Sequence, residues 1–266
     1  MPEYKDQMCR TVRLGEHPPQ RIISLVPSIT ELLFDLGLES QVVACTKFCI
    51  HPSIKTNGLK KIGGTKNIDI QSVLDLNPDL VIGNKEENTI EDISRLQQHL
   101  PIWMSDVNTI TDASSMIQQL GEITDTVAKA DQIISEINKP IHHHGLEQMD
   151  VAYLIWNKPY MVAASDTFID AMLKHAGFNN VFAEKSRYPE TTVEELRELQ
   201  PQLLMLSTEP YPFKQDHVDF FQTMLPNTRT IIADGTYFSW YGSRMVEAKK
   251  YFHSLRESVS KTGIIQ

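Results

Sequence analysis

The sequence lacks the features that mark membrane-spanning proteins, nucleic-acid-binding proteins and disulfide-rich proteins. No apolar run approaches the ~18 residues that a membrane-spanning helix needs. The net charge is −9 and lysine and arginine form no run, so the basic face that nucleic-acid binding requires is absent. Three cysteines, Cys9, Cys45 and Cys49, cannot all pair within one chain, which favours free thiols over a disulfide framework. We therefore expect a protein that neither spans a membrane nor binds nucleic acid.

Motifs of the common enzyme classes are missing as well. The sequence has no P-loop, no GxSxG nucleophile elbow, no HExxH metal motif and no GxGxxG after a predicted strand. Its first ten residues lack the apolar centre of a secretory signal. We expect a non-enzymatic protein without an intrinsic cofactor. As written it is expected in the cytoplasm, or in the periplasm or cell envelope if a signal was trimmed.

The most informative feature that is present is an internal repeat. Asn77–Glu86 (NPDLVIGNKE) returns as Gln200–Glu209 (QPQLLMLSTE) at an offset of 123 residues, and segment 68–76 returns as 191–199 in the same register. Each copy predicts a short helix, a proline, an apolar strand and a polar turn that ends in glutamate. A repeat of this length is too coarse for a solenoid and favours two similar lobes.

Strands and helices are predicted to alternate along both halves of the chain. Short apolar runs predict strands over 21–26, 41–45, 80–83, 102–104, 151–156, 203–206 and 230–233. Apolar stripes with helical spacing predict helices over 28–36, 70–76, 88–99, 110–123, 168–175, 192–199, 218–224 and 245–255. This alternation predicts an α/β fold with two similar lobes, each built on a central, mostly parallel sheet.

Capping residues predict where three of these helices begin. Ser28 and Thr192 each stand three residues before a glutamate, Glu31 and Glu195, which is the spacing of a capping box. Asp69 stands directly before another predicted helix and is expected to cap it.

One long helix is predicted to connect the two lobes. Apolar residues recur every seven positions from Val127, and no turn signal precedes Pro140, which should kink or end the helix. The chain is then divided into an N-terminal lobe (1–123), a stiff connecting helix (124–149) and a C-terminal lobe (150–266).

The order of motifs along the chain resembles that of a known family. Segments 6–12 (DQMCRTV), 19–37 (PQRIISLVPSITELLFDLG), 62–65 (IGGT) and 77–82 (NPDLVI) are similar to the cobalamin- and siderophore-binding proteins of ABC importers. The resemblance covers residues 6–255 and is greatest to the cobalamin-binding subgroup, also called helical-backbone metal receptors. It implies two α/β lobes joined by one long rigid helix, with the ligand held in the cleft between the lobes. It also implies carboxylates on each lobe that engage arginines of a membrane permease.

Ligands of an open α/β sheet bind beyond the carboxyl ends of its strands. Aromatic rings are concentrated after the predicted strands, and flat rings suit a large macrocycle such as a corrin or haem. The predicted ligand-binding residues are Ser28, Phe48, Thr65, Lys66, Trp156, Tyr160, Tyr188, Phe238, Trp240, Tyr241 and Arg244. The segment 238–241 (FSWY) has three rings in a loop-like stretch and is expected to be exposed at the site. Trp156, on a strand, fits the core as well as the cleft.

Glu86 and Glu209 are predicted to dock a permease, because the repeat places them at equivalent positions. A carboxylate binds arginine through two charge-assisted hydrogen bonds. Two solvated turn carboxylates would explain the same positions equally well. The expected partners are a small-molecule ligand and an ABC permease, and the chain is expected to be a monomer.

A cobalamin-like corrinoid or a related metal chelate is the expected ligand, and two other binding functions stay open. Haem would need an axial side chain. The axial candidates are His51, Cys49, Met161 and Tyr160. A ferric siderophore would instead favour Arg187 and Arg244, because arginine pairs with acidic ligand groups.

The alternative of another class is a tetrapyrrole-modifying enzyme that uses Asp106, Glu86 and His51. A third possibility is an interaction module that kept the fold and lost the ligand. Segment 45–51 (CTKFCIH) holds one cluster of soft metal ligands, whereas zinc usually binds four ligands in two closely spaced pairs, so buried thiols are favoured there. The three histidines at 142–144 would point in different directions on a helix, so no metal site is predicted.

Overall fold

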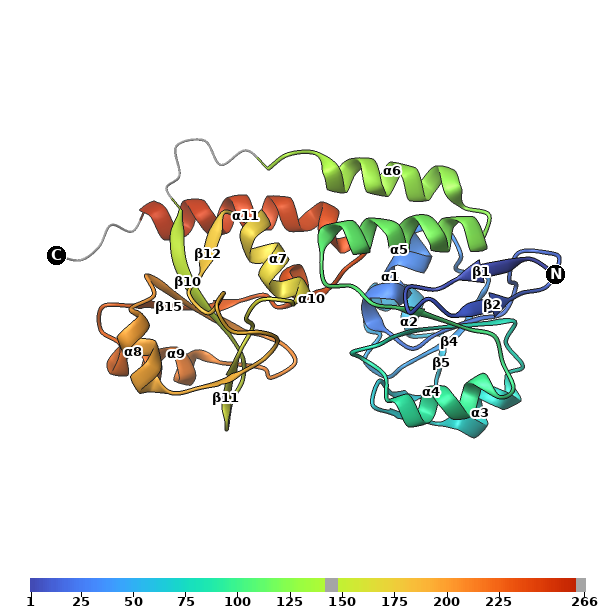
Figure 1. The fold of residues 1–266 in the computed structure, drawn as a ribbon, viewed down its shortest axis with the longest axis horizontal. Coiled ribbons are helices and arrows are strands. Elements are labelled where there is room, and N and C mark those ends of the chain that lie inside the picture. Colours follow the sequence, from blue (N-terminus) through green and yellow to red (C-terminus); the bar gives the residue numbers. More distant parts are fainter. Residues whose placement is uncertain (142–147, 262–266) are drawn as a thin grey trace. The chain divides into compact units, whose positions relative to one another are not determined.

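A computed structural model describes residues 1–141 and 148–261 of the chain, which form two compact units (Figure 1). Unit 1 is built from Met1–Val107, Thr111–Asn138 and Tyr241–Val246; unit 2 is built from Asn108–Ile110, Lys139–Trp240 and the residues from Glu247 onward. Each unit is an α/β lobe around a mostly parallel sheet, so the predicted fold class is confirmed. No helix in the described part of the chain is both long and apolar enough to cross a membrane.

Unit 1 is organised around a five-stranded sheet in the order β5–β4–β3–β8–β9, in which all neighbours are parallel. Its strands are β3 (Ile22–Ser24), β4 (Val42–Cys45), β5 (Lys60–Lys61), β8 (Leu80–Asn84) and β9 (Ile102–Ser105). The central strands are buried on both faces, as expected of a parallel sheet covered by helices. Two hairpins lie outside the sheet and pair β1 (Glu3–Lys5) with β2 (Thr11–Arg13), and β6 (Gly63–Gly64) with β7 (Asn67–Ile68).

Helices lie on both faces of this sheet, with α3 and α4 on one face and α1 and α5 on the other (Figure 1). Their bounds, with those of α2 and α6, are α1 (Pro27–Asp35), α2 (Ser53–Thr56), α3 (Ile70–Asp75), α4 (Ile90–Gln97), α5 (Ile110–Ile123) and α6 (Val127–Asn138). Helices α5 and α6 pack closely, because a Cβ added to Gly121 would lie only 2.6 Å from the Cβ of Ala130.

The helix predicted over 124–149 is shorter in the structure. Asp125 has a φ of +57° and separates α5 from α6, which ends at Asn138, before Pro140. Residues 142–147 of the predicted helix lie outside the described residues. The predicted lobe boundaries, and the role of this segment as a rigid connection, stay predictions.

Unit 2 repeats the parallel arrangement and adds antiparallel strands. Its strands run in the order β13–β11–β10–β14–β15, and β12 also pairs with β10. Their bounds are β10 (Met149–Trp156), β11 (Tyr160–Val162), β12 (Phe178–Asn180), β13 (Glu190–Thr191), β14 (Leu203–Ser207) and β15 (Arg229–Ala233). Strands β12, β14 and β15 join the parallel part of the sheet, whereas β11 is antiparallel to both β10 and β13.

The sheet of unit 2 has a packed apolar layer on each of its two faces. Leu204 and Leu206 pack with Phe221 in a cluster formed by α8 and α9, while Tyr153 of β10 contacts Phe238 on the opposite face. The helices of this unit are α7 (Phe168–His175), α8 (Val193–Leu199), α9 (Gln215–Met224), α10 (Thr236–Ser239) and α11 (Arg244–Lys261). Burial on both faces explains why β14 is a continuous apolar run.

The sequence repeat is also a structural repeat. Strand β14 starts and ends 123 residues after β8, and each of the two lies inside its sheet between two parallel neighbours. Asn77 and Gln200 each come after a helix, and both residues have a left-handed backbone conformation, with φ of +45° and +48°. The helix, the left-handed residue, the proline and the strand therefore recur as one unit.

Two of the three predicted caps are present. Asp69 and Thr192 each accept a backbone hydrogen bond from the third residue after them, at 3.0 and 3.1 Å. The cap predicted at Ser28 is wrong, because α1 begins one residue earlier at Pro27. Proline suits the first helical position, since its fixed φ fits and its missing N–H needs no partner there. Glu31 is consequently one turn inside the helix and binds a different partner, described below.

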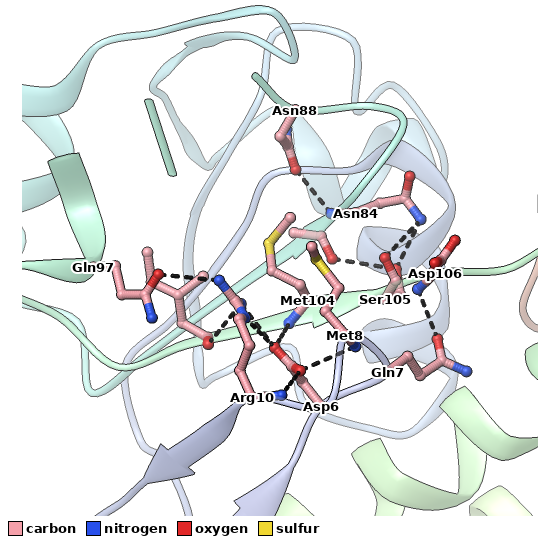
Figure 2. A network of polar contacts seen from close by, with 12 residues as sticks. Asp6, Gln7, Met8, Arg10, Asn84, Asn88, Gln97, Met104, Ser105 and Asp106 are labelled. Atoms are coloured by element: carbon pink, nitrogen blue, oxygen red, sulfur yellow. Dashed lines mark hydrogen bonds and ion pairs between the residues drawn. The ribbon is translucent and has the colours of Figure 1, made fainter. Parts of the chain in front are cut away.

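The N-terminal hairpin is anchored to unit 1 by the buried carboxylate of Asp6 (Figure 2). Its oxygens accept hydrogen bonds from Nε of Arg10 at 2.8 Å and from the amide of Met104 in β9 at 3.3 Å. They also accept from two amides of the hairpin turn, at 3.0 and 2.8 Å. The neighbouring Gln7 accepts from the amide of Asp106, at the carboxyl end of β9. The hairpin thereby braces the strand ends of unit 1.

Candidate functional site

The strand ends of unit 1 are held together by two asparagines that were not predicted as site residues (Figure 2). Asn88 donates to the carbonyls of Leu25 and Thr65, at 3.3 and 3.1 Å, and accepts from the amide of Asn84 at 2.8 Å. The side chain of Asn84 in turn accepts from the amide of Glu86 at 2.8 Å. Three strand-end segments, those after β3, β6 and β8, are thus fixed relative to one another.

Phe48 is the most exposed of the predicted ligand-binding rings, with 52% of its surface accessible. It follows β4, and its ring lies against Gly64, where an added Cβ would approach it to 3.2 Å. The Lys47 ammonium lies 5.1 Å from the ring centroid. An exposed ring that is supported on one face is well suited to stacking on a flat ligand.

The other predicted residues of this edge are less accessible. Ser28 and Thr65 are buried. Lys66 donates a hydrogen bond to the carbonyl of Glu86, so these two predicted residues do lie together.

Arg244, predicted to bind acidic ligand groups, is paired with Glu31 within unit 1. Its Nε and Nη2 atoms donate to the two carboxylate oxygens at 2.8 and 2.5 Å. Both side chains are at most 15% exposed. This bidentate pair joins the start of α11 to α1, and a ligand carboxylate would have to compete with Glu31 for the guanidinium.

Trp156 marks the corresponding edge of unit 2. It is the last residue of β10, is 40% exposed, and is contacted edge-on by Tyr211 at 5.8 Å between ring centroids. The side-chain amide of Asn157 donates through Nδ2 to the Tyr211 hydroxyl at 3.0 Å, and that hydroxyl lies 3.2 Å from Nε2 of His217. The indole is therefore held by a second ring whose own orientation is fixed by hydrogen bonds.

The expected exposure of segment 238–241 is wrong. Residues Thr236–Ser239 form the helical turn α10, which places Phe238 against Tyr153 of β10 and Phe252 of α11, at 5.0 and 4.9 Å. Phe238 has no accessible surface, and Trp240 and Tyr241 are less than 10% exposed. Phe238 is buried because the turn directs it to aromatic partners that the local sequence does not reveal.

The two remaining tyrosines have different surroundings. Tyr160 packs on Phe221 at 5.1 Å, and its partial burial raises the pKa of its hydroxyl. Tyr188 lies beneath the Arg187 guanidinium, 5.4 Å from the ring centroid. Arg187 donates to Asn108 at 2.9 Å and lines a hollow of about 440 Å³ at the start of α7. Tyr188 is thus next to a residue that lines the hollow, whereas Tyr160 packs against the core of unit 2.

The repeated glutamates end similar turns. At the last position of each repeated strand a polar side chain binds the turn backbone: Asn84 accepts from the Glu86 amide, and Ser207 accepts from the Glu209 amide at 3.3 Å. The Glu209 carboxylate also accepts from the hydroxyl of Ser239 at 2.5 Å. The turns are equivalent, although the Glu209 carboxylate binds a neighbouring element.

Comparison with known proteins agrees with this geometry. A family model described as periplasmic binding protein matches residues 22–224, which is most of the chain.

The chain belongs to the periplasmic binding protein family.

Individual relatives are distant in sequence and close in fold. A vitamin B12-binding protein of Vibrio parahaemolyticus is 25% identical over 204 residues, which cover 74% of each chain. The solved structure of the periplasmic vitamin B12-binding protein BtuF of Vibrio cholerae superposes with a TM-score of 0.76 at 21% identity, covering 92% of this chain and all of that one. The periplasmic heme-binding protein HutB of Vibrio cholerae gives the same TM-score at 22% identity, with 89% and 98% covered.

Family membership corrects the cytoplasmic location expected from the sequence. That expectation depended on a missing apolar segment near residue 1, and the family match supports a periplasmic location instead. This periplasmic binding protein is a ligand-binding protein and not an enzyme. Asp106, one of the three candidates of the enzyme alternative, is paired with Lys85 at 2.6 Å.

The described residues bring together no group of three or more His, Cys, Asp or Glu side chains that could hold a metal ion. The histidines at 142–144 lie outside the described residues. Cys49, a candidate axial ligand for haem, is buried together with Cys45, whereas Cys9 is exposed; all three are free thiols.

Sequence reasoning missed the residues that support this periplasmic binding protein's candidate rings. Asn157 directly follows the predicted strand that ends at Trp156, so the strand-end rule points to it although it is not among the predicted ligand-binding residues; Tyr211 comes four residues after β14 and lies just beyond the reach of that rule. Asn88 carries no such signal, because its partners lie up to 63 residues away in the chain.

Proposed function

We propose that this periplasmic binding protein captures a cobalamin-like corrinoid or a related metal chelate and delivers it to an ABC importer. The exposed indole of Trp156 at the carboxyl end of β10 is the observation that carries the proposal. The name of the Vibrio parahaemolyticus relative, vitamin B12-binding protein, supports the same ligand class. The process is capture, and no bond of the ligand is made or broken.

The rings supply the binding energy in this proposal. Trp156 and Phe48 expose 40% and 52% of their surfaces at strand ends, and each ring can stack on a flat ligand. Tyr211 and Asn157 hold the indole, and Gly64 supports the phenyl ring. Because these side chains are already oriented, little conformational entropy is lost when the ligand binds.

Replacing Trp156 with alanine is expected to raise the dissociation constant for cyanocobalamin by about tenfold. Losing the stacked indole and its apolar contact surface removes on the order of 1.4 kcal/mol of binding free energy, which corresponds to that factor. Calorimetric titration of the purified protein measures the change, and absorption spectra after desalting show whether ligand is retained.

Phe220→Ala is the matched control, because Phe220 is a similarly exposed ring, at 44%, that lies within α9 and not at the end of a strand. Equal losses in the two variants would contradict a specific role for Trp156. Parallel desalting with haemin tests the other ligand class: retention of haemin without cyanocobalamin would make the chain a haem carrier. Retention of neither would overturn the proposed function.

Glu86 and Glu209 are proposed to contact arginines of the permease. Glu86→Lys is expected to lower uptake of bound ligand about tenfold, because a charge-assisted hydrogen bond contributes roughly 1.5–3 kcal/mol and the new lysine repels arginine. Uptake of labelled ligand by cells that carry the chain's own importer measures this effect, while ligand affinity in solution is unchanged. Glu122→Lys, the same change at an exposed position of α5, is the control. Equal uptake in both variants would remove Glu86 from the docking surface.

A further inference from the structure

Two buried cysteines meet at the end of β4 in unit 1. Cys45 is the last residue of the strand, and Cys49 closes the following turn through a hydrogen bond from its amide to the carbonyl of Thr46 at 3.1 Å. Both side chains are essentially inaccessible. The two thiols are close enough that each is the main influence on the pKa of the other. One cation also contacts both residues, because the Lys61 ammonium reaches the Cys45 sulfur and the Cys49 carbonyl oxygen.

The surroundings of this pair are polar, unlike those of an ordinary core cysteine. The hydroxyls of Thr30 and Thr46 lie 3.1 and 3.2 Å from the Cys49 sulfur. The Lys61 ammonium donates to the Cys45 sulfur at 3.2 Å and to the Cys49 carbonyl at 3.0 Å. A structural cysteine usually behaves as a small apolar side chain, so hydrogen-bond donors and a cation around this pair need another explanation.

These contacts favour a thiolate at Cys49. The hydrogen bond from the Cys45 thiol, helped by Thr30 and Thr46, lowers the pKa of Cys49 to about 7 although burial opposes ionisation. The same hydrogen bond, together with burial, raises the pKa of Cys45. Cys49 therefore ionises first and is the nucleophile of the pair, since the thiolate is the reactive form.

We propose that Cys45 and Cys49 form a disulfide that closes the turn bearing Phe48. A disulfide requires two β-carbons about 3.5–4.5 Å apart, and the tight turn between Thr46 and Cys49 together with the shared Lys61 contact keeps the two cysteines close to each other. Disulfides persist in the periplasm, which is the location that the family supports. The bond would restrict the turn that positions the exposed Phe48 ring.

The reaction is thiol–disulfide exchange with a disulfide oxidant, either a small molecule or an oxidising dithiol protein. The Cys49 thiolate attacks one sulfur of the oxidant, so that a mixed disulfide forms and one oxidant thiolate leaves. Cys45 then loses its proton and attacks the Cys49 sulfur, which expels the second oxidant thiolate. The cysteine pair loses two electrons and two protons, and the oxidant is reduced to two thiols. Because both thiols are buried, the turn Thr46–Cys49 has to open during the exchange.

The full chain can be tested by equilibrating it with excess oxidised glutathione at neutral pH under native conditions. Acid quenching, denaturation and alkylation with N-ethylmaleimide are followed by intact mass measurement and peptide mapping. In the Cys9→Ser variant, which removes the exposed thiol and its mixed disulfides, both remaining cysteines are expected to escape alkylation. The mass should fall by two hydrogens, with a link between the peptides that carry Cys45 and Cys49.

Two controls show whether the fold directs this pairing. The wild-type chain is expected to give the same link under native conditions, and a mixture that includes links to Cys9 when it is oxidised in guanidinium. Two alkylated cysteines in the Cys9→Ser variant after equilibration would overturn the proposal, as would two glutathione adducts without an internal link. The measurement involves no ligand, so it is independent of the proposed function.

Discussion

Replacing Asp6 with alanine is expected to lower the free energy of unfolding of unit 1 by about 3 kcal/mol, because removing one partner of a buried ion pair costs roughly 3–5 kcal/mol. The Asp6 side chain is completely buried, and Arg10 is 24% exposed, which puts the effect at the lower end of that range. The substitution also leaves the Met104 amide and two turn amides without their acceptor. All of these groups lie in the network of Figure 2.

Urea unfolding followed by tryptophan fluorescence measures this change. Trp103 of β9 is buried next to Met104 and reports on unit 1 when Trp156 and Trp240, in unit 2, are replaced by phenylalanine. The control is Glu3→Gln, because Glu3 forms an exposed ion pair with Arg13 in the same hairpin, and exposed pairs contribute little. Its midpoint is expected to match that of the parent. A midpoint for Asp6→Ala equal to that of the control would show that the hairpin is not anchored through this carboxylate.

The Asp6 network also shows where sequence patterns stop being informative. Strands β8 and β14 and the caps at Asp69 and Thr192 were predictable, because apolar runs and capping are local properties of the chain. Asp6 and Met104 are 98 residues apart, and nothing near Asp6 indicates that it accepts hydrogen bonds from β9.

The exposure of the predicted ligand-binding rings was harder to predict than their position along the strands. The strand-end rule correctly brought Phe48 and Trp156 to the carboxyl ends of strands, since it depends only on where strands end. It failed for Phe238, which is buried by Tyr153, from a strand that ends some 80 residues earlier. Whether a ring is exposed depends on tertiary partners, and one sequence does not contain that information in a local pattern.

The ion pair between Glu31 and Arg244 is another long-range contact that local sequence patterns do not reveal, because the two residues are 213 positions apart. Arg244→Met is expected to lower the free energy of unfolding by about 3 kcal/mol, because it leaves a buried carboxylate without its cation. Glu31→Gln is expected to destabilise the protein by a comparable amount. Urea unfolding of unit 1 followed through Trp103 measures both effects.

A double-mutant cycle separates this structural role from the ligand role predicted for Arg244. If the pair is structural, the double variant Glu31→Gln/Arg244→Met will be about as stable as either single variant, because residues in one ion pair are not additive. If Arg244 instead serves the ligand, Arg244→Met will weaken cyanocobalamin binding while Glu31→Gln leaves it intact, and the two stability losses will simply add. If the losses of unfolding free energy in the two single variants add up in the double variant, Arg244, at the start of α11, does not stabilise the protein through its ion pair with Glu31. Equal affinity in all variants would remove Arg244 from the ligand site.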